Sequence, residues 1–347
     1  MDERYNKIAG SLIGGAVGDA LGYQIEFKTN IKEKEVTRFD GTGIISDDTQ
    51  MTLFTANALL WRETRLHMRG IAMAPTNAIY LGYLDWLETQ TGEKFNQENI
   101  SWIKDIKELN VRRAPGNTCL NALYSGKMGT IEEPINNSKG CGTVMRIAPI
   151  GLYASDPYMA GTTAAEASAI THGHPLGIIP SFVMSSMINL ILNKNMSILD
   201  SLNESMKLLK DYNKFDKEYI DEFENIVNKA VKLSTENKSD IESIKEIGEG
   251  WVAEEAFAIA LYSCLKYPNS FEDAVVCAVN HDGDSDSTGA VAGNIIGTAL
   301  GLTNIPKYYI DNVELKDIIL EIAYDLSIKV PVDEYAPNND EKWLRKY

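Results

Sequence analysis

Apolar residues recur along most of this chain at the spacing of an α-helix. From Met51 they fall at Phe54, Ala58 and Trp61, at intervals of three, four and three residues, which is the pattern of one buried helix face. Residues 251–265 are strongly apolar and rich in alanine, which is typical of a central helix. Strand-like alternation is scarce, and no strand–helix–strand succession is evident. The pattern therefore predicts an all-α protein.

Two of the predicted helices carry a glycine at every fourth position. Glycine inside a helix costs about 1 kcal/mol relative to alanine, and close contact with a neighbouring helix can compensate for this cost. Some of these glycines could instead mark turns or helix ends, above all the last of each series. We expect two tightly packed central helices that bring Asp19 and the acids described below into one cleft. The two series are Gly10, Gly14, Gly18 and Gly22, and Gly289, Gly293, Gly297 and Gly301.

The remaining organisation is that of one domain spanning residues 1–347. Residues 193–250 are rich in Lys, Glu, Asp and Asn and predict peripheral amphipathic helices with a charged loop near 234–240, whose charges form a solvated face. The apolar runs 8–22 and 289–303 are too short to span a bilayer. No secretory signal is recognisable at the N-terminus. We expect a soluble cytoplasmic protein.

The composition excludes several classes of function. The net charge is −16 and the isoelectric point about 4.8. This disfavours nucleic acid and an anionic membrane surface as partners, because both need a basic face. The four cysteines show no CxxC pairing, and the four histidines form no HExxH motif or Cys/His cluster. Buried or incidental thiols are expected, and a zinc site is improbable.

Candidate chemistry lies in two acid–hydroxyl clusters, each directly before an apolar helical run. The first cluster is Ser46-Asp-Asp-Thr49, and the second is His281-Asp-Gly-Asp-Ser-Asp-Ser-Thr-Gly289. Carboxylates and hydroxyls are hard oxygen ligands that suit Mg²⁺ or Mn²⁺. The alternative is ordinary helix capping. In the second cluster, however, Asp282, Asp284 and Asp286 crowd together, and like charges repel unless a cation holds them.

Five segments in this order resemble the ADP-ribosylglycohydrolase family, the group of the dinitrogenase reductase-activating glycohydrolase. The resemblance covers roughly residues 8 to 304, and the Asp-Ser-Asp-Ser-Thr-Gly form is most similar to the ADP-ribosylarginine hydrolase branch. Any one segment would be weak evidence, but five in order are specific. They are Gly18-Asp-Ala-Leu-Gly22, Ser46-Asp-Asp-Thr49, Gly140-Cys-Gly-Thr-Val-Met-Arg-Ile-Ala-Pro-Ile-Gly151, Thr171-His-Gly-His-Pro175 and Gly283-Asp-Ser-Asp-Ser-Thr-Gly289.

The resemblance implies a compact fold of many helices around a dinuclear Mg²⁺ or Mn²⁺ centre in a central cleft. Asp48 and Asp286 are the first candidates for the catalytic carboxylate, and Glu26 is the third. An exposed loop acid is the alternative for Glu26. Carried over by motif, the implied metal ligands are Ser46, Asp47, Asp48, Asp284, Asp286 and Ser287.

The glycine-rich segment that begins at Gly140 is a candidate phosphate loop, because small residues let backbone N–H groups approach a pyrophosphate. A simple turn is the alternative. Arg146, in the same segment, could contact a phosphate or form a structural salt bridge. The resemblance implies that the loop holds the diphosphate of ADP-ribose. Trp251 could stack on the adenine or lie in the core. His172 could reach a ribose or a phosphate, as the resemblance suggests, or bond to backbone. The candidate ADP-ribose contacts are Asn117, Gly140, Cys141, Gly142, Thr143, Met145, His172 and Trp251, with Thr118 and His174 as further possibilities.

The function implied by the resemblance is hydrolysis of the N-glycosidic bond between ADP-ribose and an arginine side chain of a protein. The sequence leaves serine and O-acyl linkages open. Two further readings stay open as well. The chain could be an immunity protein that binds or reverses an ADP-ribosyltransferase toxin, or a protein that binds ADP-ribose without cleaving it. The complete set of acids and hydroxyls in both clusters favours the enzyme.

Overall fold

The computed structural model describes residues 2–27, 35–328 and 330–347. No strand forms within these ranges, where isolated bridges join Gly43 to Val313 and Gly140 to Val252. The all-α prediction is confirmed. The helices are α1 (Glu3–Tyr23), α2 (Asp47–Arg69), α3 (Pro75–Thr91), α4 (Asn117–Tyr124), α5 (Ala148–Tyr153), α6 (Pro157–Ala169), α7 (Pro175–Lys194), α8 (Ile198–Asp211), α9 (Lys217–Ser234), α10 (Asp240–Ile247), α11 (Ala253–Lys266), α12 (Phe271–Val279), α13 (Ser285–Leu300), α14 (Lys307–Asn312), α15 (Lys316–Ser327) and α16 (Glu341–Lys346), with 3-10 turns η2 (Trp102–Asp105), η3 (Lys107–Leu109), η4 (Val144–Arg146) and η5 (Leu302–Asn304).

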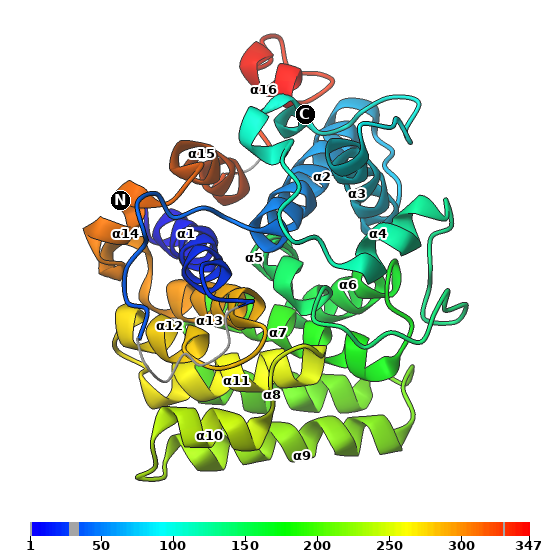
Figure 1. The fold of residues 1–347 in the computed structure, drawn as a ribbon. Helices are drawn as coiled ribbons and strands as arrows, with labels where there is room; N and C mark the ends of the chain where they lie inside the picture. Colours follow the sequence, from blue (N-terminus) through cyan, green and yellow to red (C-terminus); the bar gives the residue numbers. More distant parts are fainter. Residues whose placement is uncertain (1, 28–34, 329) are drawn as a thin grey trace.

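The two glycine series face each other between α1 and α13, which lie side by side at the centre of the molecule (Figure 1). A Cβ atom at Gly14 or Gly18 would overlap the backbone carbonyl of Gly293 or Gly289. The pairing of the two predicted helices is therefore confirmed. Of the eight glycines in the two series, only Gly301 ends a helix, with φ of +76° at the C-terminal cap of α13.

Helices α8, α9 and α10 form the outer edge of the molecule, shown in green to yellow-green at the bottom of Figure 1. Each is amphipathic, since α8, for example, buries Leu202, Met206 and Leu209 and exposes its charged residues. Residues 235–239 form the predicted charged loop between α9 and α10. These helices cover α7 and α11 and lie away from the two acid–hydroxyl clusters.

Helix α7 is the one helix in the described part of the chain that is long and apolar enough to cross a membrane. Its most apolar window is 94% buried inside the molecule, so it is a core helix.

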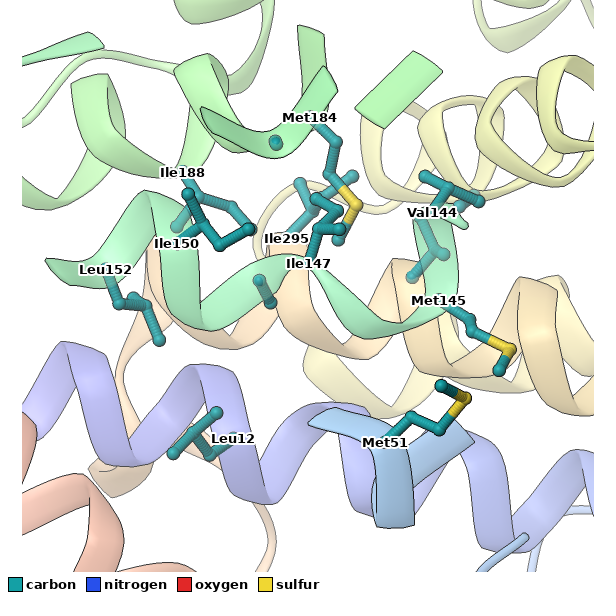
Figure 2. Close-up of a cluster of buried hydrophobic side chains, with 14 of the residues drawn as sticks. Leu12, Met51, Val144, Met145, Ile147, Ile150, Leu152, Met184, Ile188 and Ile295 are labelled. Atoms are coloured by element: carbon teal, nitrogen blue, oxygen red, sulfur yellow. The ribbon is translucent and has the colours of Figure 1, made fainter. Parts of the chain in front are cut away.

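The segment that follows the predicted phosphate loop is anchored in the core. Figure 2 shows η4 and α5 with α7 above them, α1 and α2 below them, and α13 behind them. Val144, Ile147 and Ile150 are each at most 2% exposed. Since loss of such packing costs several kcal/mol, this segment gives the loop at 140–143 a rigid base.

Candidate active site at the N-termini of two helices

The two acid–hydroxyl clusters lie together at the starts of α2 and α13. Asp47 and Asp48 are in the first turn of α2, Asp284 caps α13, and Asp286 is in its first turn. Glu26 follows the end of α1. One carboxylate oxygen from each of Glu26, Asp284 and Asp286 lies within 4.8 Å of the other two. The glycine contacts cause this arrangement, because they bring the end of α1 against the start of α13.

Asp19 fixes the start of α2 to α1. Its carboxylate accepts hydrogen bonds from the backbone N–H groups of Ser46, at 2.9 Å, and Thr49, at 3.1 Å, and from the Thr49 hydroxyl. Burial raises the pKa of Asp19 to about 6, although these hydrogen bonds oppose the shift. Asp19 does not line the cavity described below. It therefore positions the first cluster.

Part of each cluster performs ordinary capping. The Ser46 hydroxyl accepts a hydrogen bond from the Asp48 N–H at 3.3 Å, and the Asp284 carboxylate accepts one from the Ser287 N–H at 3.3 Å. One cap satisfies the geometry of a helix start. The other acids in the two clusters therefore need a different explanation.

The remaining acids are buried and poorly compensated. Asp47, Asp48 and Asp286 are at most 4% exposed. Burial first, and repulsion between the carboxylates second, raise the pKa of each well above the ordinary aspartate value. Asp48 Oδ2 has no hydrogen-bond partner within the described ranges. A buried carboxylate without a partner is stable only with a proton or a cation, so this set of hard oxygen donors fits a divalent cation.

Glu26 belongs to the same group and is not an exposed loop acid. Burial, followed by the nearby Asp286 carboxylate, raises the pKa of Glu26 to about 9. Its Oε2 is buried and has no hydrogen-bond partner in the described part of the chain. Glu26 therefore lies where a cation or a proton would relieve the same repulsion.

The acidic centre opens into a cavity of about 550 Å³, within the size range of small-molecule sites. Four of the sequence-predicted site residues do not line it, namely Ser46, Gly140, Thr143 and His172, and neither do the further possibilities Thr118 and His174. The predicted residues that do line it are Glu26, Asp47, Asp48, Asn117, Cys141, Gly142, Met145, Trp251, Asp284, Asp286 and Ser287.

A short strap, residues 248–252, joins the predicted phosphate loop to the second cluster. The Trp251 carbonyl accepts a hydrogen bond from the Cys141 N–H at 3.2 Å, and the Glu249 carbonyl accepts one from the Asp284 N–H at 2.9 Å. One carboxylate oxygen of Glu255 accepts from the N–H groups of Glu249, at 3.0 Å, and Gly250, at 3.2 Å. The strap thus sets the position of both parts of the site.

Trp251 lies on this strap, outside α11, and is 43% exposed. The alternative that it is a core residue is therefore wrong. An aromatic ring at the cavity wall can stack on a base, and its contact with adenine stays a prediction.

His172 lies behind the loop. It is 1% exposed, and its Nδ1 is 2.8 Å from the Thr171 hydroxyl. A Cβ atom at Gly142 would lie 3.3 Å from the imidazole Cε1. Burial, followed by the charge of Arg146, lowers the pKa of His172 to about 3. This neutral imidazole supports the loop from the core side, while His174 caps α7.

Arg146 is fully buried and takes neither role considered for it, since it forms no ion pair in the described ranges and does not line the cavity. Its guanidinium lies over the ring of Tyr83, 4.3 Å from the centroid, and donates to the Thr171 hydroxyl at 2.7 Å. A cation–π contact of this kind stabilises a desolvated guanidinium. Arg146 therefore holds η4 to α3 and to the segment before His172.

The Cys141 thiol touches the second cluster directly. Its Sγ lies 2.6 Å from Asp284 Oδ2, so the thiol donates to a predicted metal ligand. Burial, and then the Asp284 carboxylate, raise the pKa of this thiol well above its ordinary value. All four cysteines are free.

The loop before α4 contributes cavity residues that the sequence analysis missed. Arg112 is the one basic side chain among the described residues that line the cavity. Ala114, in the same loop, has a left-handed backbone conformation with φ of +51°. Arg113 holds this turn by donating to the Ile45 carbonyl at 2.9 Å and by pairing with Glu314. The adjacent Pro-Gly sequence marks a turn, but nothing in the sequence says which arginine faces the cavity.

An all-α fold in which buried acids open into a cavity is compatible with a helical enzyme that has an oxygen-ligand metal site. Residues 1–335 match the sequence model of the ADP-ribosylglycohydrolase family, so the chain belongs to this family. The resemblance seen in the five motifs is thereby confirmed, and it extends over almost the full length.

Named relatives differ in the substrates that their names give. The ADP-ribosyl-[dinitrogen reductase] glycohydrolase of Rhodospirillum rubrum is 23% identical, covering 90% of this chain and 92% of its own length. The ADP-ribosylarginine hydrolase Tri1 of Pseudomonas putida is 23% identical, covering 96% and 81%. The ADP-ribosylhydrolase ARH3 of Gallus gallus is 24% identical, covering 89% of each.

A solved structure titled ADP-ribosylglycohydrolase-related protein complex has the same fold. Its TM-score is 0.67 at 22% identity, and the match covers 94% of this chain and 99% of that one. The chain is thus a hydrolase of a family that acts on ADP-ribosylated substrates.

Proposed function

We propose that this protein removes ADP-ribose from modified arginine side chains of proteins. The observation that carries the proposal is the cavity in which the buried acids of α2 and α13 face Trp251 and the loop at 141–142. Two relatives whose names specify dinitrogen reductase or arginine match over nine tenths or more of this chain. The acidic surface, with a net charge of −16, is compatible with a basic substrate protein.

The residues that would hold two divalent cations are the carboxylates of Asp47, Asp48, Asp284 and Asp286, with Glu26 beside them. Ser46 is a weaker candidate, because its hydroxyl caps α2 and does not line the cavity. When bound, Mg²⁺ or Mn²⁺ would polarise a water and orient the ribose hydroxyls. The buried carboxylates that lack hydrogen-bond partners supply the negative charge that such cations require.

The chain itself would bind and orient the substrate. The backbone N–H of Gly142, which lines the cavity, donates no hydrogen bond within the described ranges, so this donor is available to a diphosphate. Asn117, at the start of α4, lines the same cavity. Trp251 would stack on the adenine, which places the distal ribose over the acids.

A carboxylate near the anomeric carbon would take a proton from the attacking water or stabilise the positive charge of the transition state. Asp48 and Asp286 are the first candidates, because both are buried, line the cavity and come from opposite helices. Glu26 is the third candidate, because it lines the same cavity and a carboxylate oxygen lies within 4.8 Å of those of Asp284 and Asp286.

The test is a comparison of linkages. The protein with Mg²⁺ is incubated with ADP-ribosyl-arginine, ADP-ribosyl-serine and O-acetyl-ADP-ribose, and free ADP-ribose is measured. We expect release from the arginine conjugate, abolished by EDTA. Faster release from the serine or O-acyl compound would move the activity to that linkage. If the protein binds ADP-ribose but releases it from none of the three substrates, it is a binding protein and not an enzyme.

A further inference from the structure

A second cavity lies away from the acidic centre and shares no lining residue with it. Its volume is about 620 Å³, and it lies between the first turn of α1, the C-terminal half of α2, α5, the start of α6 and the end of α15. Cavities of this size hold small organic ligands.

The wall of the second cavity is mainly apolar and partly rigid. Leu59, Ile150 and Leu326 are each at most 4% exposed. Figure 2 shows Ile150 beside Ile188, so the buried core behind this wall fixes it. Met159, which is 49% exposed, lies at the same cavity. An apolar chain or ring that enters the cavity would therefore move from water into contact with a preformed apolar surface.

Polar groups also converge at this apolar wall. Arg4, Arg62, Glu63 and the hydroxyl of Tyr153 all line the cavity. Burial and then the Glu63 carboxylate raise the pKa of that hydroxyl, and the charges of both arginines oppose the shift. The Tyr153 hydroxyl forms no hydrogen bond within the described ranges. A few converging polar groups in an apolar cavity are typical of a ligand site.

Among the described residues, the charge of Arg4 is opposed by the Coulomb effect of Asp2, without an ion pair. Its guanidinium donates to Asn193 Oδ1 at 2.9 Å and to the Leu152 carbonyl at 3.1 Å, both uncharged acceptors, and forms no ion pair in the described ranges. Burial lowers the pKa of Arg4. Arg62, by contrast, pairs with Glu63 at 2.9 Å. Because Arg62 and Glu63 both line the cavity and offset each other, the charge of Arg4 is left in excess there, in a chain whose net charge is −16.

We propose that this cavity binds a small amphipathic monocarboxylate, with the carboxylate at Arg4 and the Tyr153 hydroxyl and the apolar body against Leu59, Ile150 and Leu326. A single negative charge matches the one unpaired guanidinium, and a carboxylate accepts hydrogen bonds from both donors. A nucleotide fits less well, because its phosphates carry more charge than the lining can balance. The inference does not depend on the reaction in the acidic cavity.

Octanoate is a suitable probe, measured by titration calorimetry on the metal-loaded protein with saturating ADP-ribose to fill the acidic cavity. We expect one octanoate per chain. Octanol, which lacks the charge, and acetate, which lacks the chain, should each bind at least about tenfold more weakly.

The Arg4→Met substitution should weaken octanoate binding by at least about tenfold, because the charged hydrogen bond is lost while the apolar stem remains. Arg112→Met is the matched control, since it makes the same change in the acidic cavity and should leave octanoate binding unchanged. Tyr153→Phe removes only the hydroxyl and should weaken binding about three- to tenfold, so the proposal stays testable if Arg4→Met does not fold.

Absence of octanoate binding up to ~1 mM, a range that covers weak small-ligand complexes, would overturn the proposal. Equal binding of octanol and octanoate would overturn the role of the charge. Unchanged binding in folded Arg4→Met and Tyr153→Phe, or a loss confined to Arg112→Met, would place the ligand elsewhere and contradict the proposed site.

Discussion

Helix starts on the surface and helix starts at the acidic centre use the same residue types with opposite electrostatic results. At α8, α10 and α12 a serine caps the helix, and an exposed acid, Asp200, Glu242 or Asp273, lies in the first turn. The Ser239 hydroxyl donates to Glu242, and this hydrogen bond lowers the pKa of that carboxyl. The carboxylates of these acids lie near the positive end of the helix dipole and remain exposed to water.

At α2 and α13 the corresponding acids are buried and their pKa values are raised. One cap serves each helix there too, but the additional carboxylates face one another across the cavity. A serine-and-acid motif that remains exposed to water therefore indicates only the start of a helix. Burial turns the surplus acids into a site that needs a cation or a proton.

The largest expected effect comes from neutralising the buried acids. Asp48→Asn and Asp286→Asn should each lower the release of ADP-ribose by at least ~10²-fold, if they supply metal positioning or base catalysis. Asp273→Asn, which neutralises an exposed first-turn acid, should leave turnover unchanged. Activity and melting temperature are measured on the same samples. Buried variants that melt lower yet keep full specific activity when folded would reduce both aspartates to capping residues.

Metal affinity should separate the buried acids from the exposed acids at helix starts. Asp284→Ala should weaken Mn²⁺ binding to the metal-stripped protein by at least about tenfold, whereas Asp200→Ala should not change it. Titration calorimetry gives both affinities. Asp284→Ala can also stabilise the metal-free protein, because it removes one of the repelling carboxylates. Equal Mn²⁺ affinities for the Asp284 variant and the unmodified protein would refute the metal assignment at α13.

Glu255 offers a smaller and more selective test, since it positions the site through the strap without lining the cavity. Glu255→Ala removes the acceptor for two backbone N–H groups and should lower kcat/KM about three- to tenfold. Glu255→Gln keeps an acceptor oxygen and should recover most of the activity. Glu249→Ala is the control, because only the backbone of Glu249 takes part. If Ala and Gln at 255 behave alike, the strap does not position the site.

The smallest expected effect is a pH dependence of the metal-free protein. The folded-state pKa of Glu26 is about 9, above its unfolded value, so the folded state keeps a proton that the unfolded chain has lost. Stability should therefore fall as pH rises from 7 to 8.5. His172 and His281, whose pKa values are lowered to about 3 and about 4, act in the opposite direction only below about pH 6.5.

Melting temperatures of the metal-free protein at pH 7 and 8.5 test this expectation, with a predicted decrease on the order of 2 °C. Saturating Mg²⁺ should remove most of that slope, and the Glu26→Gln substitution should reduce it, because the raised pKa values of Asp47, Asp48 and Asp286 act in the same direction. A metal-free protein that becomes more stable over this range would show that Glu26 is already ionised.

Much of the architecture could be predicted from the sequence because it depends on the spacing of residues that are close together in the chain. The period of 3.6 residues predicted the helices, and the glycine series predicted that α1 and α13 pack closely. The two acid–hydroxyl clusters and the five ordered motifs identified the family. Each of these signals depends on neighbours within a few residues, or on the order of short motifs.

Tertiary structure decided which of these residues face the cavity. Trp251 lies at the wall and not in the core, His172 supports the loop from behind, and Arg146 stacks on Tyr83. Asp19 meets the start of α2, and the carbonyl of Glu249 meets the N–H of Asp284. The second cavity joins Arg4 to residues near the C-terminus. The sequence by itself determined helices, family and candidate chemistry. Burial and hydrogen bonds between distant segments, which no local pattern encodes, decided the role of each side chain.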